Sequence, residues 1–223
     1  MKREPWMALA CVACVLAVTA CSGGTRPDAG DSLASLDPLL PYLGQLPPGT
    51  EARAFAPGVV NTAAIELNGV FTPDGREFFF TRHLDGIGTI HHSVLGPDGW
   101  SDPVPLDVYG GSARSLAVDM AVSPDGDSLY FLGQHPHPGA PVDPTTDIWV
   151  SRRVDGKWST AEVVPAPVST AAEELYPVVV ADGSLYSSPD RDNDAGRLAP
   201  CRAQRPPAGR FAGRDGGLHL LVI

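Results

Sequence analysis

Short apolar runs recur along the chain from about residue 54, and each ends in a turn that is rich in Gly, Pro or Asp. Such runs are typical of β-strands, whereas an amphipathic helix needs a longer stripe of apolar residues at a 3.6-residue period. The runs 78–80 and 129–131 carry a large apolar or aromatic residue at every position. Because successive side chains of a strand point to opposite faces, these strands are expected to be covered on both faces, as in stacked sheets.

The apolar runs belong to a unit that occurs three times. The first copy lies at 68–81, the second at 119–131, and a weaker third at 176–186. The acidic residues of their turns are 51 and 57 residues apart. A second turn, Asp-Gly followed by Trp, occurs at 98–100 and again at 155–158. A unit of about fifty residues that provides four antiparallel strands has the size of one β-propeller blade.

The turns also carry a family resemblance. Phe-Thr-Pro-Asp-Gly at 71–75 and Val-Ser-Pro-Asp-Gly at 122–126, each followed by an aromatic-rich strand, resemble the repeats of TolB-like, WD-like β-propellers. The segment 147–152 is similar to a later strand of that repeat, and the resemblance extends over about 55–191. It implies an all-β fold, namely a partial β-propeller of about three four-stranded antiparallel blades with an irregular C-terminal tail. It says little about activity, because propellers support many functions.

The residues of the repeated turns are expected to be structural. Proline pre-sets the backbone angle φ for the turn, aspartate accepts hydrogen bonds from its own backbone, and glycine adopts the positive φ that closes the hairpin. The turn residues are Pro73, Asp74, Gly75, Pro124, Asp125, Gly126, Asp182 and Gly183.

The repeat weakens in its third copy and stops near residue 196. Ala181 replaces the turn proline, and Ser187 stands where an aromatic residue is expected. The tail 197–223 contains five Arg and one acidic residue, and it shows no strand alternation before Leu218. We expect it not to supply two strands of a blade and interpret it as a degenerate blade or an out-of-frame end of a longer gene. Closed propellers have about four to eight blades, so three blades leave two open edges unless another segment or chain covers them.

The N-terminus has the pattern of a secretory signal. Lys2 and Arg3 precede an uncharged run from Trp6 to Ala20, which is too short to span a bilayer comfortably. Val18-Thr19-Ala20-Cys21 resembles the lipobox of bacterial lipoproteins, which implies cleavage before Cys21 and acylation of its thiol. Ser22 in place of Asp implies, by resemblance to Gram-negative lipoproteins, the outer membrane, facing the periplasm or the exterior. The alternative is that Cys21 is only one more small residue of the signal.

The sequence therefore divides into four parts. They are a signal peptide at 1–20, a tether and Pro/Leu-rich lead-in at 21–53, a propeller repeat region at 54–196, and the tail at 197–223. The prolines of the lead-in forbid a long helix, so short turns are expected to dock its leucines onto the domain.

Composition and charge narrow the class of protein further. Charged residues make up 19% of the chain, and 24 Gly and 23 Pro interrupt it too often for long helices. The net charge is −10 without a basic stripe, which argues against nucleic acid as a partner. Cys201 has no intramolecular partner once the signal is cleaved and Cys21 is acylated, so no disulfide framework is expected.

Three groups of residues invite a metal hypothesis, and one of them is the loop pair His135 and His137. His91 and His92 are adjacent, but on a strand they point to opposite faces and do not share one ion simply. The loop 190–196 resembles the start of a calcium loop, with candidate ligands Asp190, Asp192 and Asp194, although glycine is seventh instead of sixth and the twelfth position is Cys201. We expect no cofactor, with Ca²⁺ as the alternative at this loop.

The function expected from these features is non-enzymatic. The chain is interpreted as a lipid-anchored cell-envelope scaffold that binds another envelope protein or a peptide, and its anchor places it at the membrane. Serine-hydrolase and phosphate-loop motifs are absent from the sequence. One alternative is a propeller-type hydrolase of glycans or peptides that uses His135, His137 and Asp143. Another is a non-functional fragment of a longer propeller protein.

Overall fold

The computed structural model describes residues 41–46, 49–111, 115–136, 145–188, 201–204 and 212–213. All of these belong to one unit, Leu36–Ile223. No helix in this part of the chain is long and apolar enough to cross a membrane. Several sequence predictions fall outside the described residues, and they concern Cys21, His137, Asp143, Asp190, Asp192 and Asp194.

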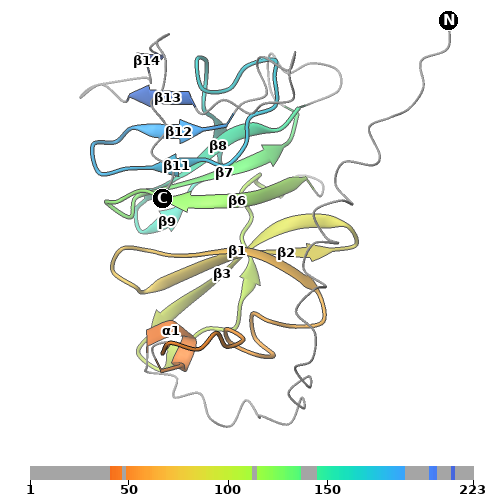
Figure 1. Ribbon diagram of the computed structural model, residues 1–223, viewed down its shortest axis with the longest axis vertical. Coiled ribbons are helices and arrows are strands. Elements are labelled where there is room, and N and C mark those ends of the chain that lie inside the picture. Colours follow the sequence, from red (N-terminus) through yellow and green to blue (C-terminus); the bar gives the residue numbers. More distant parts are fainter. Residues whose placement is uncertain are drawn as a thin grey trace, which may run out of the picture. The chain divides into compact units, whose positions relative to one another are not determined.

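The described elements are one short helical turn, α1 (Pro41–Gly44), and strands in three antiparallel sheets (Figure 1). The first sheet, blade 1, has the ladder β1 (Ile65–Phe71), β2 (Glu77–Leu84), β3 (Ile87–Gly96) and β5 (Val104–Pro105). The short strand β4 (Gly99–Trp100) folds back onto the end of β3.

The second sheet, blade 2, repeats this order. Its ladder is β6 (Leu116–Val122), β7 (Ser128–Gln134), β8 (Asp147–Val154) and β10 (Glu162–Val163), and β9 (Lys157–Trp158) folds back onto β8. The match extends to an irregularity in the first strand of each blade, where Asn68 and Asp119 both have positive φ. Asn and Asp tolerate this conformation better than most residues.

The third sheet, blade 3, consists of β11 (Val178–Val179), β12 (Leu185–Ser187), β13 (Cys201–Gln204) and β14 (Ala212–Gly213). The expected fold class, a partial propeller of about three four-stranded antiparallel blades, is confirmed. The expectation that 197–223 does not supply two blade strands is wrong, because β13 pairs with β12 through Cys201–Ala203 and β14 pairs with β13. Backbone hydrogen bonds form this ladder without the apolar alternation on which the sequence prediction depended.

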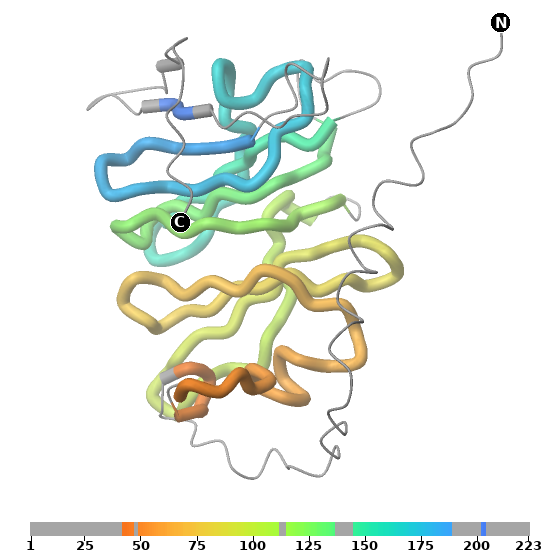
Figure 2. The backbone as a smooth tube through the Cα atoms, in the orientation of Figure 1, coloured from red at the N-terminus to blue at the C-terminus, as the bar shows by residue number. Residues whose placement is uncertain are grey.

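The three blades stack on one another (Figure 2). Apolar side chains fill the contacts between them. Phe79 of blade 1 packs into one cluster with Leu129 and Phe131 of blade 2. On the opposite face of blade 2, Tyr130 and Leu132 belong to a second cluster, which reaches blade 3. Alternation along β7 therefore fills both interfaces, as the sequence predicts for strands that are apolar at every position.

The outer face of blade 1 is covered by the end of the lead-in and by the residues that follow it directly. Leu43, Ala56 and Val60 are buried against Phe78 and Phe80 of β2. We name the segment with these three residues the lead-in cap. The prediction that leucines of the lead-in dock on the domain holds for Leu43, which is 4% exposed, and fails for Leu46, which is 77% exposed. The lead-in cap thus covers the outer face of blade 1.

Candidate functional site

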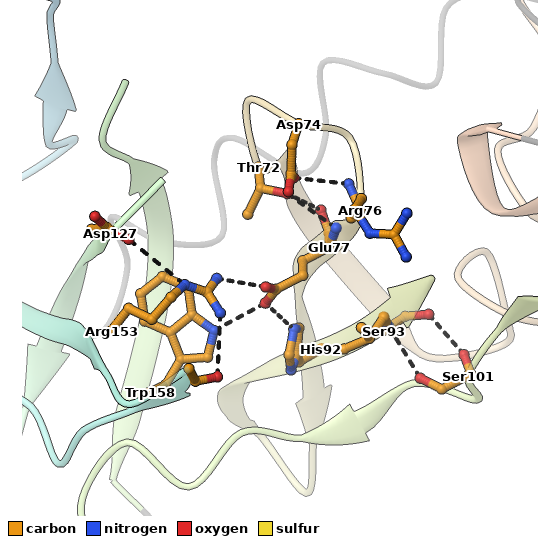
Figure 3. A network of polar contacts seen from close by, with 12 residues as sticks. Thr72, Asp74, Arg76, Glu77, His92, Ser93, Ser101, Asp127, Arg153 and Trp158 are labelled. Carbon is orange, nitrogen blue, oxygen red and sulfur yellow. Dashed lines mark hydrogen bonds and ion pairs between the residues drawn. The ribbon is translucent and has the colours of Figure 1, made fainter. Parts of the chain in front are cut away.

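A polar cluster lies where the rims of blades 1 and 2 meet (Figure 3). Glu77 is the first residue of β2 and His92 lies on β3, whereas Arg153 is near the end of β8 and Trp158 ends β9. The turn before β2 sets the position of Glu77, because the backbone N–H of Glu77 donates a hydrogen bond to Thr72 Oγ1 at 3.0 Å. The cluster therefore joins two consecutive blades through residues that are 76 to 81 positions apart in sequence.

The Glu77 carboxylate accepts hydrogen bonds from three directions. Arg153 Nη2 is 2.5 Å from Oε1, while His92 Nε2 and Trp158 Nε1 are 2.7 Å and 3.1 Å from Oε2. An ionised carboxylate only accepts hydrogen bonds, so the Nε2 atom of His92 carries a proton and donates it. The three donors hold Glu77 in one orientation.

The electrostatic state of Glu77 follows from two opposing effects. Burial alone would raise its pKa, but the hydrogen bonds from His92, Trp158 and Arg153 outweigh burial and lower its pKa to about 2. Glu77 is therefore ionised at neutral pH. A general acid needs a raised pKa, so this carboxylate is suited to an ion pair and not to proton donation.

Aromatic contacts fix the surrounding rings. The His92 ring stacks on Phe79 with centroids 4.5 Å apart, and Trp158 meets the same Phe79 edge-on at 5.6 Å. The Arg153 guanidinium lies over the Trp158 ring, 4.4 Å from its centroid. This cation–π contact and the ion pair with Glu77 constrain the guanidinium from two sides.

The cluster forms one wall of an open hollow of about 370 Å³. Val94 and Leu106 contribute apolar surface, Lys157 contributes an exposed cation, and the polar cluster completes the lining. The hollow thus offers an apolar surface beside positive charge. A protein or peptide segment with an apolar side chain next to an acidic one fits that chemistry.

The structure places the predicted turn residues in three similar hairpin turns. Asp74, Asp125 and Asp182 each accept a hydrogen bond at Oδ1 from the backbone N–H two residues later, at 3.0, 3.0 and 2.8 Å. The glycine that follows each of them has φ of 69°, 79° and 78°. In blades 1 and 2, the hydroxyl of the preceding Thr72 or Ser123 also donates to the turn carboxylate. These contacts are local to the turns, and none of these carboxylates lines the hollow.

The predicted histidines lie apart from one another. His91 packs near Phe80, on the face towards the lead-in cap, whereas His92 stacks on Phe79 and faces blade 2. Burial lowers the pKa of His91. His135 stacks on Tyr109 at 4.3 Å, and its Nδ1 atom lies 2.8 Å from the Ser115 hydroxyl. Within the described residues, no three His, Cys, Asp or Glu side chains are arranged to hold a metal ion.

The sequence prediction missed the residues that build the polar cluster. Glu77 follows the first turn, and Arg153 precedes the Asp-Gly turn of blade 2, 76 residues later. Trp158 belongs to the repeated Asp-Gly-Trp turn, and the corresponding Trp100 of blade 1 packs with the Phe78 cluster beneath the lead-in cap. Each tryptophan thus faces the element that precedes its blade. The repeated Asp-Gly-Trp turn is the sequence feature that could have marked Trp158 as a candidate site residue.

Comparisons with known proteins found a partial likeness among solved structures and none in sequence. No protein-family model matches the sequence, and no curated protein is similar to it in sequence. Among solved structures, the chain is similar to a protein described as TolB from Agrobacterium tumefaciens, with 19% sequence identity and a TM-score of 0.40. The match covers 61% of this chain, and this chain spans 45% of the length of that structure.

Proposed function

We propose that this protein is a lipid-anchored cell-envelope scaffold that binds a protein or peptide partner in the hollow between blades 1 and 2. The observation that carries the proposal is the composition of the hollow. A tryptophan and an arginine, held rigidly by Glu77, stand beside exposed apolar surface. Tryptophan and arginine are the residues most enriched among those that dominate protein–protein binding energy.

The state of the polar cluster favours binding over catalysis. Glu77 is ionised and its oxygens are occupied by three donors, so it is poorly placed to transfer a proton. The next carboxylate beside the cluster, Asp127, is 3.9 Å from Arg153 Nε and 66% exposed. Pre-organised side chains lose little entropy on binding, which is an advantage for a recognition surface.

The hydrolase alternative is supported by one contact. The Ser115 hydroxyl and His135 Nδ1 are 2.8 Å apart, which is within the range of a nucleophile and its base. Activity screens against glycans and peptides, with Ser115→Ala and His135→Ala as matched variants, test this alternative. Hydrolysis that both substitutions abolish would replace the scaffold proposal, whereas blank screens support it.

The binding proposal is tested by cross-linking in intact cells. A photo-reactive amino acid replaces Val94 in the hollow, and in a control it replaces Ile65, which is 62% exposed and lies at the opposite end of blade 1. The partner cross-linked at position 94 is identified and purified, and its affinity is measured. We expect Lys157→Glu to weaken binding about tenfold or more, without affecting the fold because Lys157 is exposed. Equal cross-linking at both positions, or an affinity unaffected by Lys157→Glu, contradicts the proposal.

The anchor is proposed from the Val18-Thr19-Ala20-Cys21 segment. Cys21→Ala is expected to abolish acylation and globomycin-sensitive processing and to release the protein from the membrane fraction. Several acyl chains bind a membrane far more strongly than a single one, so the change in fractionation is expected to be large. Unchanged mobility and unchanged membrane association of Cys21→Ala contradict the anchor, and they leave the binding test in the hollow unaffected.

A further inference from the structure

His92 has a second ring nitrogen that the polar cluster does not use. Its Nε2 atom lies 2.7 Å from Glu77 Oε2 (Figure 3). The ring stacks on Phe79 with an angle of 2° between the two planes, which fixes the direction of the other nitrogen, Nδ1. Within the described part of the chain, Nδ1 makes no hydrogen bond and is not a buried atom. Because His92 lines the hollow, a partner that occupies the hollow meets Nδ1.

Glu77 determines the chemical character of Nδ1. A neutral imidazole carries one N–H group and one lone pair, on different nitrogens. Glu77 is ionised at neutral pH and accepts a hydrogen bond from Nε2, so the proton of a neutral His92 lies on Nε2. The lone pair then lies on Nδ1, which is a hydrogen-bond acceptor. A carboxylate commonly fixes the tautomer of a functional histidine in this way.

The donors of the cluster itself do not serve this acceptor. Arg153 Nη2 and Trp158 Nε1 both donate to the Glu77 carboxylate. A partner that covered Nδ1 without offering a donor would leave a buried acceptor unpaired, which is unfavourable. Tight binding in the hollow therefore requires a donor on the partner.

The surroundings of His92 indicate what lies next to that donor. Val94, two residues along β3, is 39% exposed and lines the hollow. Val104 pairs with His92 from β5 and is 56% exposed. An apolar side chain beside the donor would bury this surface, and burial of apolar surface favours binding.

We propose that His92 Nδ1 is the hydrogen-bond acceptor by which the hollow recognises its partner, and that the partner donates an N–H or O–H group from beside an apolar side chain. This inference rests on the proposed function, because it concerns the same hollow. It adds a requirement for a donor, which the cross-linking at Val94 and the Lys157→Glu variant do not test.

Nitrogen NMR of the histidine-labelled full chain in detergent tests the tautomer without any partner. At about pH 8, where an imidazole is ordinarily neutral, we expect a proton on Nε2 of His92 and none on Nδ1. The His92→Gln variant assigns the signals. A proton on Nδ1 overturns the proposal.

Titration with small probes under the same conditions tests recognition. Isobutanol offers an O–H group, N-acetyl-leucine methylamide offers amide N–H groups, and isobutyl methyl ether has no donor. We expect a donor probe to move the Nδ1 signal of His92 towards that of a protonated nitrogen, in a saturable manner, and the ether to leave it unchanged. Whichever donor acts more strongly distinguishes a hydroxyl from an amide. His91, which packs near Phe80 on the other face, is the internal control.

Absence of a shift with both donors, or an equal shift with the ether, overturns the inference. Such a result leaves a partner that is cross-linked at position 94 unaffected. Conversely, a shift at Nδ1 without any cross-linked partner contradicts the proposed function and not the acceptor role of His92.

The purified partner provides a second measurement. His92→Gln retains an N–H group for Glu77 but removes Nδ1, and it is expected to weaken binding about tenfold or more. Circular dichroism establishes that the variant is folded. An unchanged affinity overturns the proposal, and if the variant does not fold, the probe titration decides.

Discussion

Glu77 of blade 1 and Arg153 of blade 2 form an ion pair, with Oε1 and Nη2 2.5 Å apart. The pair lies at the rim of the interface whose interior is filled by Phe79, Leu129 and Phe131. The ion pair links the rims of the two blades beside this apolar cluster. The same pair orients the Trp158 and Arg153 side chains that line the hollow.

Glu77→Gln is expected to destabilise the protein by about 1–3 kcal/mol, because Arg153 loses its ionised partner in a partly buried site. Chemical denaturation at neutral pH measures the change. The matched control is Glu51→Gln, at an exposed position of the lead-in, which is expected to change stability by less than about 0.5 kcal/mol. Equal stability of the two variants would show that the Glu77 ion pair contributes nothing.

The contribution of Glu77 depends on pH in a defined direction. Its pKa in the folded protein is about 2, below its usual value of 4.5. A lowered folded-state pKa contributes stability that is present above the unfolded pKa and is lost as the pH falls towards the folded pKa. The stability difference between wild type and Glu77→Gln is therefore expected to be constant at neutral pH and to shrink between about pH 4.5 and 2. A difference that grows on acidification contradicts this assignment.

Asp119→Asn is expected to stabilise the protein at neutral pH. In blade 1 the corresponding Asn68 accepts a hydrogen bond at Oδ1 from the Met120 backbone N–H, 2.9 Å away. The residue of blade 3 that corresponds to Met120 is Pro177, which has no N–H to offer Asp119. Burial raises the pKa of Asp119, so its ionised form is disfavoured in the folded state.

The pKa of Asp119 is raised in the folded protein whereas that of Glu77 is lowered, so the two carboxylates affect stability in opposite directions as the pH changes. A raised folded-state pKa gives stability that is present at low pH and is lost as the pH rises through the folded pKa. The advantage of Asp119→Asn is therefore expected at pH 7 and should vanish at a pH below the unfolded-state pKa of Asp119. Thermal unfolding of wild type and Asp119→Asn, at pH 7 and at a pH below the unfolded-state pKa of Asp119, measures this difference in stability. A variant that is less stable than wild type at pH 7 contradicts the account.

The lead-in cap is tested by two leucines of the same segment. Leu43→Ala is expected to cost about 2–4 kcal/mol, because it opens a cavity against Phe78 and Phe80. Leu46→Ala removes a side chain that is 77% exposed and is expected to cost less than about 0.5 kcal/mol. Urea denaturation compares the two variants, and equal effects would mean that the lead-in does not cover blade 1.

The turns and the blade unit were predictable because their determinants are local. Pro-Asp-Gly fixes a turn within a few residues, and the structure has the expected hairpins at Asp74, Asp125 and Asp182. Apolar residues at every position of β2 and β7 likewise indicate sheets that are covered on both faces. The partial propeller follows from these two signals and their repetition.

The contacts between repeats were not predictable in the same way. Nothing in the spacing of Glu77 and Arg153 marks them as partners, because the pairing depends on how two blades stack. The lead-in cap was foreseen only as docked leucines, and its position over Phe78 is a property of the tertiary structure. β13 was missed because its sequence, Cys-Arg-Ala-Gln, lacks apolar alternation and is held by pairing with β12.

Hydrogen exchange, measured peptide by peptide, tests the stacked and capped blades most directly. Amides of β2 and β7 are expected to exchange at similarly slow rates, because the lead-in cap covers the outer face of blade 1 as blade 3 covers that of blade 2. Slow exchange in both strands supports a stack in which the lead-in cap covers the outer face of blade 1. If β2 exchanges about 100-fold faster than β7, blade 1 is uncovered and the account is contradicted.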